Sequence, residues 1–171
     1  MARLAEPIVS TFVLDHYLAL AIGPPGAASL ERAVRLAGEG VLDGIVPVIR
    51  EFADVEIVTD VINQSCVYLV RLDNGDCAAV RISTLLPVAS VAIYRSNVFE
   101  RFTVLDEPDE QLAKLGDLLR RLGIAVLDEA TCRADSLYRN DEGTGYDTYF
   151  EVLFEFDAAP PWKAFDPRQH G

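Results

Sequence analysis

The first fifty residues are predicted to be helical. "IVSTFVLDHYLALAI" (8–22) is apolar apart from a few positions such as Asp15 and His16, which favours a helix packed on most sides. After the turn at "GPPGAAS" a second helix is expected, capped by Ser29. A short helical piece is expected around 48–53. The apolar face of the second helix carries Leu30, Val34, Ala37 and Val41.

From Val55 the hydrophobic pattern becomes that of an antiparallel meander. Alternating or β-rich runs predict strands near residues 55–62, 66–73, 76–83 and 88–95. Asn74-Gly75, between the second and third strands, predicts a type I′ hairpin turn. That turn would pair Tyr68 with Arg81, and Cys66 with Ser83.

The hairpin "CVYLVRLDNGDCAAVRIS" (66–83) is apolar on both faces, so both faces need a cover. The N-terminal helices on one face and the later helix at 108–122 on the other would bury the hairpin within the chain. A partner protein or a second copy of the chain is the alternative cover.

The segment 108–122 has the features of an amphipathic helix. Pro108 lies in its predicted first turn, acids lie near its start, Arg120 and Arg121 lie at its end, and Gly123 follows. The buried stripe is predicted to be Leu112, Leu115, Leu118, Leu119 and Leu122.

After this helix the pattern predicts strands again. "IAVLDEA" is a candidate short strand, and "SLYR" and "YDTYFEVLFEF" flank "NDEGTG" as a second hairpin. Phe150 and Phe154 then lie on an apolar strand face, and Glu151 and Glu155 lie on an acidic one.

Together these patterns predict an α+β fold. It has N-terminal helices, an antiparallel sheet of about five to six strands, and one further amphipathic helix packed on the sheet. Residues 1–171 are interpreted as a single globular domain, with a partly ordered tail from about 160 that Trp162 and Phe165 pin to the body.

The charge of the chain limits the classes of partner that it can bind. Its 27 acids and 15 bases give a net charge of −12, which repels nucleic acid and anionic lipid. Residues 101–171 carry 15 acids and 8 bases, so this shorter part is the denser negative source, with a net charge of −7. The run 8–22 is too short for a bilayer span and lacks a basic flank, so no membrane partner is predicted.

Candidate chemistry is sparse. An odd number of cysteines and no export signal favour three reduced thiols in a cytoplasmic protein. His16 is interpreted as a satisfied or partly exposed core histidine and His170 as part of a frayed end. The pattern of "NDEGTGYD" (140–147) does not match a calcium loop, and "GPPGAAS" lacks the lysine of a phosphate-binding loop, so no metal, cofactor or catalytic residue is predicted.

The favoured hypothesis is a non-catalytic domain that docks a basic protein through an acidic surface, as an inhibitor or neutraliser would. A small, acidic, cytoplasmic α+β domain of this kind resembles bacterial immunity proteins in type, with no shared motif. A homodimer is left open. The predicted partner-binding residues are Asp106, Glu107, Asp109, Glu110, Asp141, Glu142, Asp147, Glu151 and Glu155.

The alternative hypothesis is a small enzyme or a small-molecule-binding domain. Its pocket would lie between helices and sheet, lined by Tyr68, Arg81, Tyr94 and Cys132. A bound small molecule would favour this alternative, and a captured protein partner would favour the first hypothesis.

Overall fold

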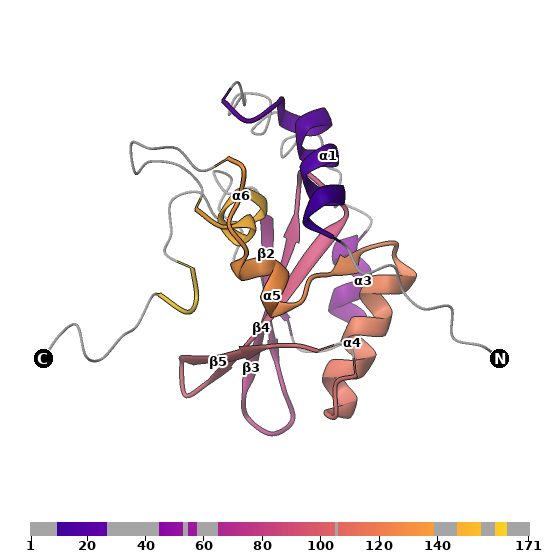
Figure 1. The fold of residues 1–171 in the computed structure, drawn as a ribbon. Helices are drawn as coiled ribbons and strands as arrows, with labels where there is room; N and C mark the ends of the chain where they lie inside the picture. The colour runs from indigo at the N-terminus through magenta and orange to yellow at the C-terminus, as the bar shows by residue number, and fades with distance from the viewer. Residues whose placement is uncertain are drawn as a thin grey trace, which may run out of the picture.

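A computed structural model of the chain describes residues 10–26, 45–52, 55–57, 65–104, 106–138, 147–154 and 160–163 (Figure 1). Helices and strands are both present and helices pack on the sheet, so the predicted α+β class is confirmed. The predicted second helix, with Ser29, lies outside the described residues. The helices are α1 (Thr11–Ile22), α3 (Ile45–Phe52), α4 (Glu110–Arg121), α5 (Glu129–Arg133) and α6 (Tyr149–Leu153), and the strands are β1 (Val55–Ile57), β2 (Ser65–Arg71), β3 (Cys77–Ser83), β4 (Val88–Arg95), β5 (Val98–Phe102) and β6 (Ala125–Val126).

Strands β1 to β4 form the predicted antiparallel meander, and β5 extends it, each strand lying beside the next. The sequence analysis missed β5. It follows β4 through a turn in which Ser96 and Asn97 both have positive φ (50° and 65°), the geometry of a type I′ hairpin. The predicted short strand after α4 is β6, which pairs with the start of β4 in the parallel direction.

The register predicted for the β2–β3 hairpin is wrong by one residue. Tyr68 lies opposite Val80 rather than Arg81, and Cys66 lies opposite Ile82. The turn is not type I′, because the Leu72 carbonyl accepts from Gly75 N at 3.0 Å, and Leu72 N donates to Asp76 O at 2.9 Å.

This arrangement is a three-residue loop with Gly75 at φ +89°. The Asn74 side chain accepts from Asp76 N at 2.9 Å, which holds the extra residue in place. In the observed register, large apolar side chains of β2 and β3 lie on the same face of the sheet. In the predicted register, which differs by one residue, they would lie on opposite faces.

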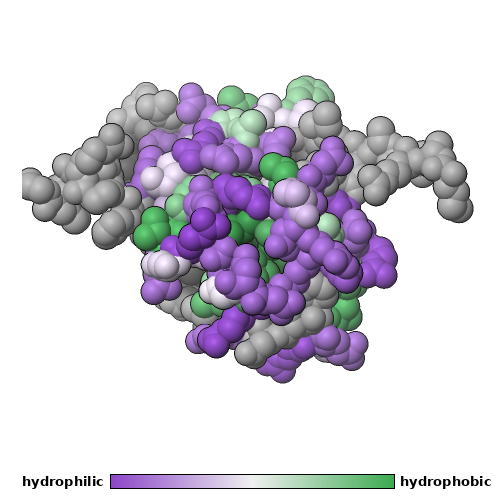
Figure 2. All heavy atoms as spheres, turned by 90° about the horizontal axis from the view of Figure 1, so that it is seen from below, coloured by the Kyte–Doolittle hydropathy of each residue, from purple (hydrophilic) through white to green (hydrophobic). Residues whose placement is uncertain are grey.

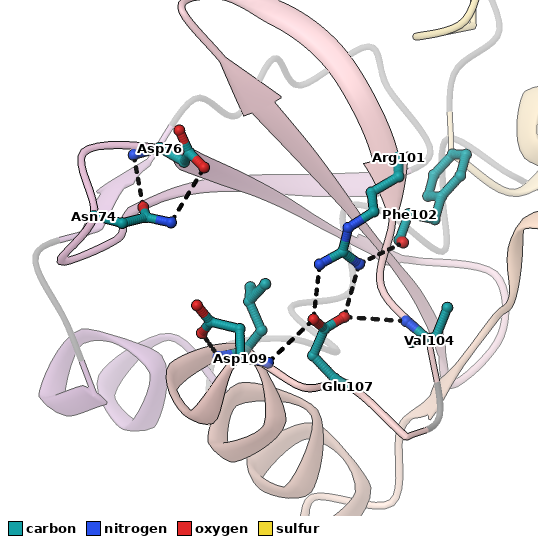
Figure 3. Close-up of polar contacts among 8 residues, drawn as sticks. Asn74, Asp76, Arg101, Phe102, Val104, Glu107 and Asp109 are labelled. Atoms are coloured by element: carbon teal, nitrogen blue, oxygen red, sulfur yellow. Dashed lines mark hydrogen bonds and ion pairs between the residues drawn. The ribbon is translucent and has the colours of Figure 1, made fainter.

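Both faces of the sheet are covered by helices of the chain itself. The face that carries Tyr68, Val80 and Val91 packs against α4, whose Leu112, Leu115 and Leu119 are buried. The opposite face, with Ala92 and Phe102, packs in one cluster with α1, α5 and α6. On the α4 side the hairpin is buried within the chain, as predicted. On the other side Ala79 and Arg81 are buried, but Val67 and Leu69 are only partly buried. Figures 1 and 3 both show α3 beside α4.

Helix α1 is less enclosed than the sequence predicted. Leu14, Leu18 and Ile22 form its buried stripe, but its outer side is exposed. Ser10 caps the helix by accepting from Val13 N. Two tyrosines hold α1 to the body: Tyr149 donates to the Asp15 carboxylate at 2.5 Å, and Tyr138 donates to the Gly23 carbonyl at 2.8 Å.

The predicted second hairpin is mostly wrong. A single antiparallel bridge joins Asp135 to Thr148, and the chain then enters α6 instead of a strand. Thr148 and Glu151 form a capping box, in which each side chain accepts from the backbone N–H of the other residue. The alternation of Phe150 and Glu151 therefore does not separate two strand faces.

The prediction that Trp162 pins the tail is confirmed. Its ring packs edge-on against Phe102 and Phe150, and the Arg133 guanidinium lies 4.6 Å from its centroid. Phe165 lies outside the described residues.

Candidate functional site

Two segments that carry carboxylates, the β2–β3 turn and the start of α4, lie beside each other at one end of the molecule. Asp73 N donates to Gln111 Oε1 at 2.9 Å, which places the β2–β3 turn beside the start of α4. Figure 3 shows residues of both segments in one view. We call this group the acidic end, and it consists of Asp73, Asp76, Asp106, Glu107, Asp109 and Glu110.

Glu107 has an internal structural role within the acidic end. Its carboxylate accepts two hydrogen bonds from Arg101, at 2.7 and 2.8 Å, and further ones from the backbone N–H of Val104 and Asp109 (Figure 3). Its side chain is only 3% exposed. The Arg101 guanidinium holds the pKa of Glu107 below its usual value, although burial acts in the opposite direction. This pair fixes the segment between β5 and α4.

Three other members of the acidic end also have local partners. Asp109 is the N-cap of α4 and accepts from Leu112 N at 2.9 Å. Asp76 has a 13% exposed side chain and lies 3.6 Å from Arg95. Glu110 is 83% exposed and pairs with Lys114 at 2.7 Å, which lowers the pKa of Glu110.

Asp73, Asp106 and Glu110 are the exposed carboxylates of the acidic end. Figure 2 views the molecule from below, the side on which Figure 1 places the β2–β3 turn, and hydrophilic residues cover most of this face. An approaching cation would therefore meet these three side chains first.

The other predicted partner-binding residues lie elsewhere or outside the described part. Asp147 and Glu151 lie at the start of α6, and Phe154, just beyond α6, accepts from Ser65 Oγ at the first residue of β2. The β2–β3 turn follows the last residue of β2, so the two acidic groups are separated by a strand length of about 20 Å. Asp141, Glu142 and Glu155 lie outside the described residues.

Sequence reasoning missed Asp73 and Asp76 as members of the acidic group. Both lie in the turn sequence "DNGD". By itself this pattern predicts only a turn. The contact between Asp73 and Gln111 in the folded structure shows that the turn lies beside α4.

The four residues of the alternative pocket do not share one face of the sheet. Tyr68 is buried on the α4 side. Arg81 lies on the other side, with its guanidinium 5.4 Å from the Phe150 centroid, and both Cys132 and Tyr94 belong to the cluster on that side. A pocket role for these residues stays a prediction.

All three cysteines are free thiols, as predicted. Cys132 is fully buried in α5, and burial raises its pKa far above the usual value. Burial also raises the pKa of Cys77. Because the thiolate is the reactive form, a raised pKa makes these sulfurs poor nucleophiles near neutral pH.

Metal and membrane features are lacking in the residues that the structure describes. Among them no group of three histidine, cysteine, aspartate or glutamate side chains could hold a metal ion. No described helix has the length and apolarity that crossing a bilayer requires.

Comparisons with known proteins give no relative. No family model matches the chain, and no curated protein or solved structure is significantly similar to it.

Proposed function

We propose that this protein is a cytoplasmic, non-catalytic binding domain that docks a basic protein through the acidic end. An inhibitor or an immunity-type neutraliser would work in this way. The observation that supports the proposal best is the hydrogen bond between Asp73 N and Gln111 Oε1, because it gathers carboxylates from two segments at one end.

The charge of the whole molecule supports the same proposal. A net charge of −12 attracts a basic protein over a distance and repels other acidic proteins. The exposed Asp73, Asp106 and Glu110 then pair with lysine or arginine side chains of the partner. Glu107, Asp76 and Asp109 keep the turn and the α4 start in place.

Association rates with the partner captured from the native host test the proposal. The test variant is Asp73→Asn with Asp106→Asn, and the matched control is Asp135→Asn with Glu129→Gln, which removes the same charge elsewhere. The test variant is expected to associate about tenfold more slowly at low salt, and the control close to the wild-type rate.

The difference between the variants should shrink toward about 1 M salt, where the screening length falls to roughly 3 Å. Equal rates for both variants at low salt would contradict docking at the acidic end. Turnover of a small molecule by the isolated protein would instead support the enzyme alternative.

A further inference from the structure

The turn between β2 and β3 carries an asparagine followed by a glycine at the surface of the molecule. Asn74 and Gly75 are both exposed, and a Cβ added at Gly75 would meet no atom within 4 Å. The backbone nitrogen of a residue can attack the side-chain amide of a preceding asparagine, and glycine has no side chain to hinder this attack. The turn therefore brings together the two groups of a spontaneous reaction and leaves them open to water.

We propose that Asn74 is a deamidation site, and that the hydrogen bonds of the folded turn slow its reaction. The modification converts the Asn74 amide into a carboxylate, as aspartate or as isoaspartate. The reaction consumes water and proceeds without an enzyme, a metal ion or an oxidant. This chemistry goes beyond docking and does not depend on it.

The reaction takes up one water molecule and releases one ammonia molecule. The Gly75 nitrogen forms a bond to Asn74 Cγ and gives up its proton, and the bond from Cγ to Nδ2 breaks as ammonia leaves with that proton. The product is a five-membered succinimide ring. Water then opens the ring at one of its two carbonyls, which gives either aspartate or isoaspartate, in which the main chain runs through Cβ. Either acid is ionised at neutral pH, so the chain gains a negative charge.

Three hydrogen bonds in the folded turn oppose ring closure. Gly75 N donates to the Leu72 carbonyl at 3.0 Å, so the attacking N–H is already engaged. Asn74 Oδ1 accepts from Asp76 N at 2.9 Å, and Asn74 Nδ2 donates to Asp76 Oδ2 at 3.2 Å (Figure 3). Ring closure turns the Asn74 side chain toward Gly75 N and breaks these bonds. In the native protein the reaction therefore requires local opening of the turn.

Asn97 provides a comparison within the same chain. It is also exposed and lies in a hairpin turn, between β4 and β5, but Val98 follows it. The β-branched side chain of valine crowds the backbone nitrogen that would have to attack. Asn97 is therefore expected to keep its amide under conditions in which Asn74 loses it.

Deamidation changes the shape of the turn as well as its charge. A carboxylate at position 74 cannot donate to Asp76, and it places a second negative charge where the amide lay 3.2 Å from Asp76 Oδ2. Isoaspartate also lengthens the main chain inside the loop that Leu72 and Asp76 close. Both changes weaken the contact of Asp73 N with Gln111, and faster hydrogen exchange of Asp73 N–H measures this loss. An effect on docking would rest on the proposed function, but the loss of this contact does not.

Mass spectrometry of the isolated full chain after long incubation at neutral pH tests the proposal. Trypsin releases the two asparagines on separate peptides, 72–81 and 96–101, because an arginine precedes and ends each one. Deamidation at Asn74 is expected to be at least about tenfold faster than at Asn97, because glycine leaves the attacking nitrogen unhindered. Heavy-oxygen water labels carboxylates that form during the incubation, and electron-transfer fragmentation separates aspartate from isoaspartate. An Asn74 amide that survives in the native protein as long as that of Asn97 would overturn the site.

Variants of the turn test the restraint by its hydrogen bonds. Asp76→Ala removes the acceptor of Asn74 Nδ2 and keeps the backbone N–H, so it is expected to speed deamidation several-fold in the native protein. The matched control is Asp73→Ala, which removes a neighbouring carboxylate but not that acceptor, and its rate should equal that of the wild type.

The same proteins in urea show whether the effect needs the fold. There Asp76→Ala and the wild type should react at the same rate, faster than either native protein, and Gly75→Ala should slow the reaction. Circular dichroism checks that the variants are folded without urea. Equal native rates for the wild type and Asp76→Ala, or a wild-type rate that urea does not raise, would overturn the restraint.

Discussion

At the scale of single residues, several acids that the sequence predicted to bind a partner instead make hydrogen bonds within the fold. Glu107 is almost completely buried against Arg101, and Glu151 completes the capping box of α6. A carboxylate whose oxygens already accept from backbone N–H groups and a guanidinium has few acceptor positions free for a partner's side chains. Burial and hydrogen bonding therefore separate the structural acids from the exposed ones.

Glu107→Gln is expected to lower the free energy of unfolding by about 2 kcal/mol at neutral pH, because it removes charge-assisted hydrogen bonds to Arg101. The pKa of Glu107 is lowered in the folded state, so its stabilisation is complete above the usual pKa of 4.5. That stabilisation is lost as pH falls through the lower folded value. Urea unfolding of both proteins across this range should show the two stabilities converging in acid.

Cys132 is expected to react with iodoacetamide much more slowly than Cys66 or Cys77 in the native protein. It is fully buried and its pKa is raised by burial, whereas the other two are half-buried. Mass spectrometry after timed labelling measures each site. All three should react in denaturant without reductant, and a Cys66–Cys77 disulfide would contradict the reduced state.

At the scale of elements, local backbone geometry decided where the sequence predictions succeeded. The helix α4 has its signals in order: Asp109 at the N-cap, arginines in the last turn, and Gly123 beyond the end at φ +79°. For α6 the sequence Thr-Tyr-Phe-Glu (148–151) has the capping-box pattern that starts a helix. The alternation of apolar and acidic residues nearby resembles a strand by coincidence, and the strand prediction followed that alternation.

Two glycine substitutions should change stability in opposite directions. Gly75→Ala is expected to cost about 1 kcal/mol, because alanine is strained at φ +89° even though the added methyl group meets no atom. Gly116→Ala, inside α4, should stabilise by about 0.5 to 1 kcal/mol, since its Cβ approaches only the flexible end of Arg120 at 3.4 Å. Thermal unfolding of both variants measures the difference.

Core and cap substitutions test the corrected assignment of residues 148–154. Phe154→Ala and Leu115→Ala each delete a fully buried side chain, and each should destabilise by roughly 2 to 5 kcal/mol. Glu151→Ala should cost about 1 kcal/mol, because it removes the capping-box acceptor of Thr148 N. A cost near zero for Glu151→Ala would contradict the cap and favour the exposed strand face first predicted.

At the scale of the whole molecule, the excess of negative charge lowers the stability of the folded state. Like charges are closer together in the folded chain than in the unfolded chain, and salt screens their repulsion. The unfolding temperature is therefore expected to rise by several degrees between about 0.01 M and about 0.3 M sodium chloride. Calorimetry measures this rise, and a fall would show that attractive ion pairs such as Arg101–Glu107 outweigh the repulsion.

The sequence by itself determined the helical start, the meander from residue 55, the amphipathic helix α4 and the negative charge. These depend on hydrophobic period, capping residues and composition, which are local properties of the chain. The single-residue register of the β2–β3 hairpin did not follow from sequence, because Asn74-Gly75 is compatible with two turn geometries and the packing against α4 chose between them. The acidic end was likewise decided by tertiary structure, because Asp73 and Gln111 are 38 residues apart and only the folded sheet brings them into contact.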